Sequence, residues 1–517
     1  MYKDIISKSR LICSGPPAVY QVKPKKEIIE TLTKLTIGER NLNKANRAIL
    51  LVGETGAGKS SLVNALANYA MGVKFEDDIW FQIIVDEEKE GQTSDVIVYQ
   101  IFGHEDQTLP FSLTIIDTPG YGDTRGIKHD EQISLRMLDL FRSEDGVHQI
   151  HAVGLVMKAS DNRLSDRLMY VFNSVMSLFG KDLEKNIVAL ITHSDGTTPR
   201  NALKALEVAN IKSSRDKFIY FLFNNCQHED RTKEREFLER ANQTSLKGFN
   251  ELIKFIDKTK PLPLETTVEV LNERIRMMAC IQNLKDRIKM TEQKQKEIGQ
   301  FEDILRKHNA EVKENANFTI EVDEPYKDKE PISGGMWWWV FLEGAVTCNT
   351  CEETCHYPGC TMARKPEHCQ IMMDGCCTVC TNKCPASDHV KENWRYVTKT
   401  RKVQKTLNDV KEKYENKKAQ CESLLINLEE TTKILTAERS MLLDEAYSHV
   451  IKLEKIALKV DSVSTLVHLD FLIEKTKKKG DQEKVKKLGK IKNQLSEATN
   501  RALIYAKIRS LSSLHLQ

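Results

Sequence analysis

The stretch Gly53–Ser60, GETGAGKS, directly follows five apolar residues, AILLV, at 48–52. It fits the pattern GxxxxGK[ST], in which glycines let main-chain N–H groups turn inward toward phosphate groups. The apolar run before it predicts a buried strand, and SLVNALANYAMG after it predicts a helix whose N-terminus favours anions. The stretch therefore predicts a P-loop that holds a nucleotide, and a glycine-rich turn without a ligand is the alternative.

The residue types in this loop suggest separate roles. We expect the Lys59 ammonium to bridge the β and γ phosphates and the Ser60 hydroxyl to ligate Mg²⁺. The expected nucleotide contacts are Gly53, Glu54, Thr55, Gly56, Ala57, Gly58, Lys59, Ser60 and Ser61.

The chain around the loop alternates short apolar runs with helix-length segments. The runs occupy 48–52, 96–102, 111–117, 152–157, 187–192 and 218–223. Continuous apolar runs are typical of strands buried on both faces, so we expect a doubly wound, mostly parallel α/β sheet. This predicts a G domain over 46–257, preceded by an N-terminal extension at 1–45 and closed by the proline-containing stretch KTKPLPLE at 258–265.

The stretch IIDTPGYGDT, 115–124, has the residue types that a phosphate sensor needs. Asp117 ends a predicted strand, where its carboxylate can hold a Mg²⁺-bound water, and the N–H of Gly120 can contact a γ-phosphate. Upstream, EGQTSD at 90–95 offers Thr93, whose hydroxyl could close on Mg²⁺ and open when the γ-phosphate leaves. The adjacent Ser94 is the alternative to Thr93.

The choice of base is predicted from LITHSD, 190–195. Asp195 can accept hydrogen bonds from the N1 and N2 donors of guanine, whereas adenine would leave the carboxylate facing an acceptor. His193 either stacks on the purine or is a solvent-facing loop histidine. Asn224 and Asn225, in FLFNNC, are expected near the other side of the base, so the predicted ligands are GTP and GDP.

Two residues bear on GTP hydrolysis. Tyr121 follows the DTPG glycine, where many GTPases carry a glutamine that orients the attacking water, so we expect slow hydrolysis. Arg125 lies in the adjoining loop and could be offered across a dimer, or it could be an ordinary solvated residue. Thr93 and Arg125 are the residues with predicted catalytic roles.

Taken in order, GETGAGKSSLVNAL, QTS, DTPGYGDT, THSD and FNN resemble the septin, AIG1 and Toc branch of the translation-factor-related GTPases. DTPGYGD is similar to septins, whereas the TxxD form and FNN are more similar to AIG1-type, immunity-associated nucleotide-binding proteins. The resemblance covers residues 45–257. It implies binding of GTP and GDP with Mg²⁺ and dimerisation across the nucleotide face.

Beyond the G domain, apolar residues recur at steps of three and four. This pattern predicts a long helix over 264–315 and a helical, coiled-coil-like region over 396–517, with heptad positions from Val403 to Leu442. The two apolar stripes could cover each other, bind further copies of this chain, or bind another protein. The lysine-rich tail past Glu474 suits a solvated helix, with anionic membrane or nucleic acid as the alternative contact.

A cysteine-rich insert at 316–395 separates these helices. Nine of the 13 cysteines lie between Cys348 and Cys384, and the spacing C-x2-C-x3-C occurs twice. Such spacing favours structural Zn²⁺, with disulfides as the alternative. The predicted ligands are Cys348, Cys351, Cys355, Cys377, Cys380, Cys384 and His389. The nearby Trp337–Trp339 could be a core wedge, an interface or a membrane anchor.

Composition limits the wider function. The 517 residues carry a formal net charge of +3, which does not indicate a polyanion-binding chain as a whole. The N-terminus lacks the apolar run of a signal peptide, and the longest apolar stretch, 336–342, is too short to span a bilayer, so we expect a cytoplasmic protein. The sequence favours a GTP-dependent switch, with a non-hydrolysing, septin-like scaffold as the alternative.

Overall fold

The computed structural model describes residues 2–29, 32–39, 44–84, 95–102, 109–121, 127–161, 165–209, 211, 218–307, 319–332, 344–360, 363, 365–406, 421–459 and 463–493. The chain divides into two compact units. Unit 1 contains residues 1–271, 454–463 and 491–517, and unit 2 contains residues 272–453 and 464–490.

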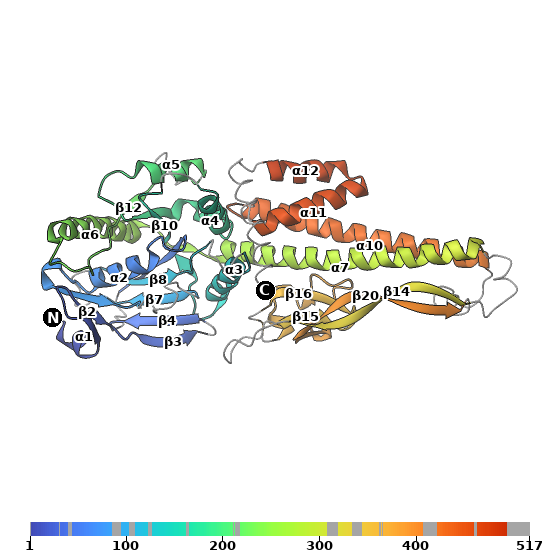
Figure 1. The fold of residues 1–517 in the computed structure, drawn as a ribbon, viewed down its shortest axis with the longest axis horizontal. Helices are drawn as coiled ribbons and strands as arrows, with labels where there is room; N and C mark the ends of the chain where they lie inside the picture. The colour runs from blue at the N-terminus through green and yellow to red at the C-terminus, as the bar shows by residue number, and fades with distance from the viewer. Residues whose placement is uncertain are drawn as a thin grey trace. The chain divides into compact units, whose positions relative to one another are not determined.

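The described part of unit 1 is built on an eight-stranded sheet (Figure 1). In spatial order the strands are β12 (Tyr220–Leu222), β11 (Ile187–Thr192), β10 (Ala152–Lys158), β5 (Asn46–Gly53), β8 (Ser112–Asp117), β7 (Ile97–Ile101), β4 (Leu32–Ile37) and β3 (Lys25–Ile29). Neighbouring strands are parallel except for the pairs β7–β8 and β3–β4. The predicted α/β fold with a mostly parallel sheet is therefore confirmed.

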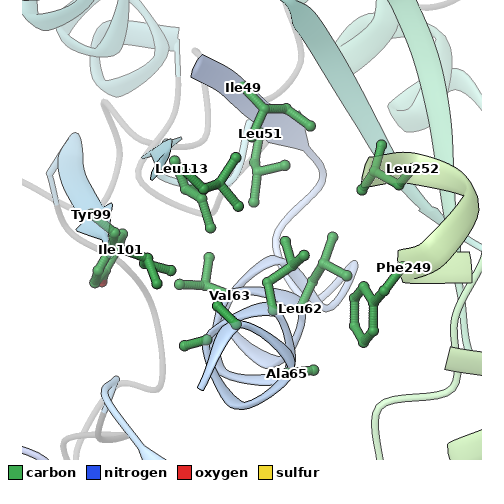
Figure 2. Packing of buried hydrophobic residues seen from close by; sticks show 14 of the residues in the cluster. Ile49, Leu51, Leu62, Val63, Ala65, Tyr99, Ile101, Leu113, Phe249 and Leu252 are labelled. Carbon is green, nitrogen blue, oxygen red and sulfur yellow. The ribbon is translucent and has the colours of Figure 1, made fainter. Parts of the chain in front are cut away.

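The helices of unit 1 connect these strands. They are α1 (Lys3–Ser7), α2 (Lys59–Ala70), α3 (Ile127–Arg142), α4 (Asp166–Met176), α5 (Arg200–Val208) and α6 (Arg235–Lys258), with the 3₁₀ turns η1 (Phe75–Asp77) and η2 (Lys181–Asn186). Apolar side chains of α2 and α6 pack on β5, β7 and β8 in one core. Figure 2 shows part of this packing, with Ile49, Leu51, Leu62, Val63, Ala65, Tyr99, Ile101, Leu113, Phe249 and Leu252 labelled.

The N-terminal residues belong to this unit as well, although the sequence predicted only an extension. β3 and β4 continue the main sheet, and β4 runs parallel to β7. β1 (Arg10–Cys13) and β2 (Ala18–Gln21) form a second, three-stranded sheet with β6 (Ile79–Gln82). A further short pair joins β9 (Gln149–Ile150) to β13 (Leu262–Pro263).

A returning segment of the chain also docks within unit 1. The Lys459 ammonium donates to the Asn173 side chain at 3.1 Å and to the Ala209 carbonyl oxygen at 2.9 Å. The N–H of Leu458 donates to the Phe179 carbonyl oxygen at 2.8 Å. Residues 454–463 therefore belong to unit 1 although more than 180 residues of unit 2 precede them.

Unit 2 contains long helices, which confirms the helical C-terminal region in outline. These are α7 (Glu265–Lys307), most of which lies in this unit, α10 (Cys421–Ile456), α11 (Val463–Lys479) and α12 (Gln482–Asn493). The Asp444 carboxylate of α10 pairs with Lys479 at 2.9 Å and with Lys484 at 2.7 Å. Part of the lysine-rich tail is thus used in ion pairs inside this unit. Among the helices that the structure describes, none has the length and apolarity needed to cross a bilayer.

The prediction of helix at Val403 is wrong. β20 (Trp394–Thr406) pairs along its whole length with β14 (Thr319–Pro331) as an antiparallel ribbon, and Val403 lies opposite Val322. Oppositely charged side chains face each other across it, including Lys399 with Asp328 at 2.7 Å. Heptad spacing cannot reveal such a distant partner. The heptad positions at 407–420 lie outside the described residues.

The cysteine module, residues 344–392, lies between these two ribbon strands in the sequence. β16 (Glu353–Cys360), β15 (Gly344–Cys348) and β19 (His389–Glu392) form a three-stranded sheet. A short pair of β17 (Met372–Met373) and β18 (Cys376–Cys377) and the turns η3 (Pro366–His368) and η4 (Ala386–Asp388) complete the module. Its buried core consists mainly of cysteines. Trp337–Trp339 lie outside the described residues.

Candidate nucleotide site

The loop between β5 and α2 has the backbone geometry of a phosphate-binding turn. Gly56 and Gly58 have φ angles of +79° and +93°, which side-chain-bearing residues rarely adopt. Gly53 lies so close to β10 that an added Cβ would be 2.4 Å from the Val156 carbonyl oxygen. Ser60 and Ser61 follow in the first turn of α2. The loop therefore turns its backbone toward the positive end of α2, as anion binding requires.

Lys59 is buried inside this turn, with 6% of its surface exposed. Its Nζ donates to the carbonyl oxygens of Gly53 and Glu54, each at 3.1 Å. Burial lowers the pKa of Lys59, and the negative charge of the buried Asp117 acts in the opposite direction. A bound phosphate group would add further negative charge beside this buried ammonium and so offset the cost of its burial.

The DTPG segment is held against the loop. The N–H of Tyr121 donates to the Gly53 carbonyl oxygen at 3.2 Å, and Thr118 donates its hydroxyl to the Leu51 carbonyl oxygen at 2.9 Å. A Cβ at Gly120 would lie 2.2 Å from the Thr55 hydroxyl oxygen and 2.4 Å from the Thr55 Cα. Only glycine fits there, so Gly120 lies directly beside the loop. Asp117, fully buried, ends β8 next to it.

The Tyr121 side chain points away from this site. It is 1% exposed, and its hydroxyl lies 3.9 Å from the Met137 sulfur of α3. Burial raises the pKa of Tyr121 well above its usual value, so the phenol stays neutral. Tyr121 therefore contacts the P-loop through its main chain, while its ring lies in the core.

The loops after β11 and β12 hold the predicted base contacts. His193 has a φ of +52° and is exposed, and its Nδ1 lies 3.1 Å from the Thr192 hydroxyl oxygen. Asp195 is exposed, and its Oδ1 accepts from the Thr197 hydroxyl at 2.7 Å and the Thr197 N–H at 2.9 Å. These two hydrogen bonds hold the pKa of Asp195 below its usual value. The carboxylate is thus charged and accessible to a ligand, and it is exposed and not buried.

Asn224 and Asn225 are anchored by one serine of α6. The Asn224 N–H donates to the Ser245 hydroxyl oxygen at 2.9 Å, and that hydroxyl lies 3.1 Å from the Asn225 Oδ1. The buried Asn225 Nδ2 has no hydrogen-bond partner among the described residues. This amide is a donor that a carbonyl group of a bound base could satisfy.

Sequence reasoning missed the role of Thr192. Its hydroxyl donates to the Ala57 carbonyl oxygen at 2.6 Å and so joins the end of β11 to the P-loop. A polar residue at the carboxyl end of an apolar strand was the available signal. It also missed Arg167 of α4, whose Nε lies 2.6 Å from the Glu54 carboxylate. The predicted catalytic residues Thr93 and Arg125 lie outside the described residues.

The predicted zinc ligands gather into two groups. One contains Cys348, Cys351, Cys380 and Cys384, and the other contains Cys355, Cys377, Cys380 and His389. A third group, which sequence reasoning did not assign, contains His356, Cys360 and Cys369. In each group the ligand atoms lie within 4.8 Å of one another. Sulfur and imidazole donors at this separation fit Zn²⁺.

Residues 47–243 match the model of the AIG1 family. This part of the chain is therefore similar to the P-loop domains of the AIG1 family. No curated protein matches the chain.

Solved structures similar to this chain include Toc33 from Arabidopsis thaliana with GDP and Mg²⁺, at 17% identity over 43% of this chain and 89% of that chain, with a TM-score of 0.31. A dimerization-deficient mutant of Toc33 is 18% identical over 44% of this chain and 84% of its own, with a TM-score of 0.29. The elongation factor SelB from Methanococcus maripaludis, with a GTP analogue, is 11% identical over 43% of this chain and 36% of its own, with a TM-score of 0.24.

Proposed function

We propose that this protein is a Mg²⁺-dependent guanine-nucleotide switch that hydrolyses GTP slowly. The observation that carries the proposal is the double attachment of Tyr121, whose N–H bonds to Gly53 in the P-loop and whose ring packs beside Met137 of α3. A γ-phosphate that accepts a hydrogen bond from the Gly120 N–H would shift Gly120 and, with it, Tyr121. Because the Tyr121 ring packs beside α3, the position of α3 would then depend on which nucleotide is bound.

The same arrangement supports slow hydrolysis. GTPases that hydrolyse efficiently need a group that orients the attacking water near the γ-phosphate. Tyr121 is buried and its hydroxyl faces Met137, so it does not supply such a group. The chain would depend on another residue or another molecule to complete the reaction.

The residues present fit Mg²⁺ and the phosphates. Ser60 in the first turn of α2 and Asp117 at the end of β8 would hold Mg²⁺, and Lys59 would neutralise the phosphates. The bound ion would add positive charge where negative charge develops on the transferred phosphoryl group. Asp195 and Asn225 would select guanine, because they offer an acceptor and a donor to its edge.

Two G domains would dimerise across the nucleotide face in the GTP state. Toc33, to which the chain is similar, was crystallised as a dimerization-deficient mutant. Thr93 would close on Mg²⁺, and Arg125 would reach the partner's nucleotide, where a supplied arginine accelerates hydrolysis by about 10³ to 10⁵. Through unit 2 the protein would contact further copies or another protein, and zinc would stabilise the cysteine module.

Phosphate release at rising protein concentration tests the proposal, with mass measured by light scattering in GDP and in a non-hydrolysable GTP analogue. We expect slow release that accelerates with concentration and a dimer with the analogue. Lys59→Ala should abolish both nucleotide binding and phosphate release. A monomer with both nucleotides, together with turnover independent of concentration, would contradict dimer-assisted hydrolysis.

The second candidate is a scaffold protein that holds GTP without hydrolysing it. It is favoured by the same buried Tyr121, since the hydroxyl of this residue faces Met137 and does not orient a water at the P-loop. Tight binding of GTP without phosphate release at any protein concentration would support this candidate over the switch.

A further inference from the structure

The two groups of zinc ligands in the cysteine module share one residue, Cys380. Its sulfur lies within 4.8 Å of the ligand atoms of both groups. Each group has four ligands only when Cys380 is included. Since structural zinc sites are almost always four-coordinate, neither site is complete without this thiolate.

The sulfur separations favour metal coordination over disulfides. The sulfurs of Cys351 and Cys384 are 3.6 Å apart, and those of Cys360 and Cys369 are 3.8 Å apart. Two thiolates on one tetrahedral Zn²⁺ at about 2.3 Å are about 3.8 Å apart, whereas a disulfide requires about 2.05 Å. The nine cysteines of the module are free.

Main-chain N–H groups point at sulfurs of the two C-x2-C segments, 348–351 and 377–380, which we call the knuckles. Cys377 accepts from the N–H groups of Val379 at 3.3 Å and Cys380 at 3.4 Å. Cys380 accepts from the N–H of Cys384 at 3.3 Å, and Cys348 accepts from that of Cys351 at 3.4 Å. Donors arranged this way stabilise thiolates, which are the form that binds zinc.

His389 is oriented as a metal ligand would be. Its Nδ1 lies 2.9 Å from the Pro385 carbonyl oxygen, which can only accept, so Nδ1 is the donor in this contact. The buried Nε2 is the other ring nitrogen, and the histidine belongs to the group with Cys355, Cys377 and Cys380. A carbonyl that fixes the imidazole in this way is the usual support for a zinc-binding histidine.

We propose that Cys380 bridges two zinc ions in a single binuclear centre. One ion is held by Cys348, Cys351 and Cys384, and the other by Cys355, Cys377 and His389, with the Cys380 thiolate completing both. This inference rests on the structural zinc proposed above and adds its nuclearity and ligand sets. His356, Cys360 and Cys369 offer three ligands to a separate, third ion.

The bridge predicts that the two ions bind and leave together. We would measure zinc per chain in the full-length protein and in three cysteine-to-serine variants. Cys380→Ser should lose two ions relative to the unmodified chain, whereas Cys360→Ser should lose one. Cys376→Ser is the matched control, because Cys376 is exposed and belongs to none of the groups, and it should lose none.

A second measurement does not need Cys380 to be replaced. X-ray absorption on the zinc of Cys360→Ser should show a zinc–zinc scattering distance in addition to sulfur. Loss of a single ion from Cys380→Ser, or a zinc spectrum without that scattering, would overturn the bridge while leaving structural zinc intact. A full-length protein that binds no zinc would overturn both, and nucleotide binding measured in the same sample would stand apart from either result.

Discussion

The Thr192 hydroxyl donates a 2.6 Å hydrogen bond to the Ala57 carbonyl oxygen, across 135 residues of sequence. The same hydroxyl lies 3.2 Å from the Met157 carbonyl oxygen at the end of β10. One buried side chain thus joins the P-loop to the two strands beside it. The predicted base contacts His193 and Asp195 follow Thr192 directly in the sequence, so this hydrogen bond ties the segment that carries them to the P-loop.

Thr192→Val should therefore weaken nucleotide binding without unfolding the domain. Valine keeps the shape of threonine but leaves the buried Ala57 carbonyl without its donor, which costs roughly 1–3 kcal/mol. We expect the Kd for GDP, measured by titration calorimetry, to rise about 5- to 140-fold. Thr192→Ser keeps the hydroxyl and should bind nearly as well as the unmodified chain. Equal weakening in both variants would mean that the methyl group, and not the hydrogen bond, matters.

Gly120→Ala should disrupt the contact between the DTPG segment and the P-loop. The added Cβ would lie 2.2 Å from the Thr55 hydroxyl oxygen, 2.4 Å from its Cα and 2.5 Å from its nitrogen. Two of these three atoms are main chain, so one segment must move. We expect loss of GTP binding by at least about tenfold, measured with a fluorescent analogue. Adding Thr55→Ala should not restore binding, and recovery in this double variant would show that only the hydroxyl clashes.

Much of unit 1 could be predicted from sequence because its signals are local. The run at 187–191 is apolar throughout, and the strand that contains it, Ile187–Thr192, is buried at every position. The roles of side chains at the ends of strands were harder to predict from the sequence. Thr192 acts through a carbonyl 135 residues away, and the direction of the Tyr121 ring depends on Met137 of α3.

In unit 2 the limits of sequence reasoning have a similar cause. Cysteine spacing predicted the knuckles, since C-x2-C brings two sulfurs together locally. It did not predict that Cys380 lies in both groups, because that follows from how β16, β18 and β19 meet. Val403 fitted a heptad yet lies in a strand, because its partner is Val322 on β14.

His151 should make the G domain sensitive to acid. It is 1% exposed, and its Nδ1 accepts from the Ala48 N–H at 3.1 Å. Burial, followed by the positive charge of Arg47, lowers the pKa of His151 to about 4. Between pH 6.5 and 4 the unfolded chain binds a proton there that the folded chain does not. Stability is therefore lost as pH falls through this range, by up to about 3 kcal/mol.

Urea unfolding at several pH values between 7 and 4 measures this effect. His151→Gln should show a smaller loss of unfolding free energy on acidification than the unmodified chain, even if it is less stable at pH 7. His148→Gln serves as the control, because His148 is exposed, and it should follow the unmodified chain. Parallel curves for all three proteins would assign the acid sensitivity to other groups.

We expect the contact between the cysteine module and α7 to depend on the acidic residue Glu353. Its buried carboxylate accepts from the Thr381 N–H at 3.0 Å and the Asn283 amide at 3.2 Å, and lies 3.8 Å from the Arg287 Nε. Thr381 follows Cys380, so this carboxylate joins the segment of the proposed metal ligand to the helix. Glu353→Gln would turn an amide toward these donors and should cost about 1–3 kcal/mol. We expect zinc to pass to a chelator faster in this variant, and the absorbance of the chelator–zinc complex measures the rate.

Glu330→Gln is the control. It removes an ion pair between Glu330 and Arg395, and because the Glu330 side chain is 41% exposed, the substitution should change the rate of zinc loss little. Equal rates in the two variants would contradict a structural link between α7 and the metal centre.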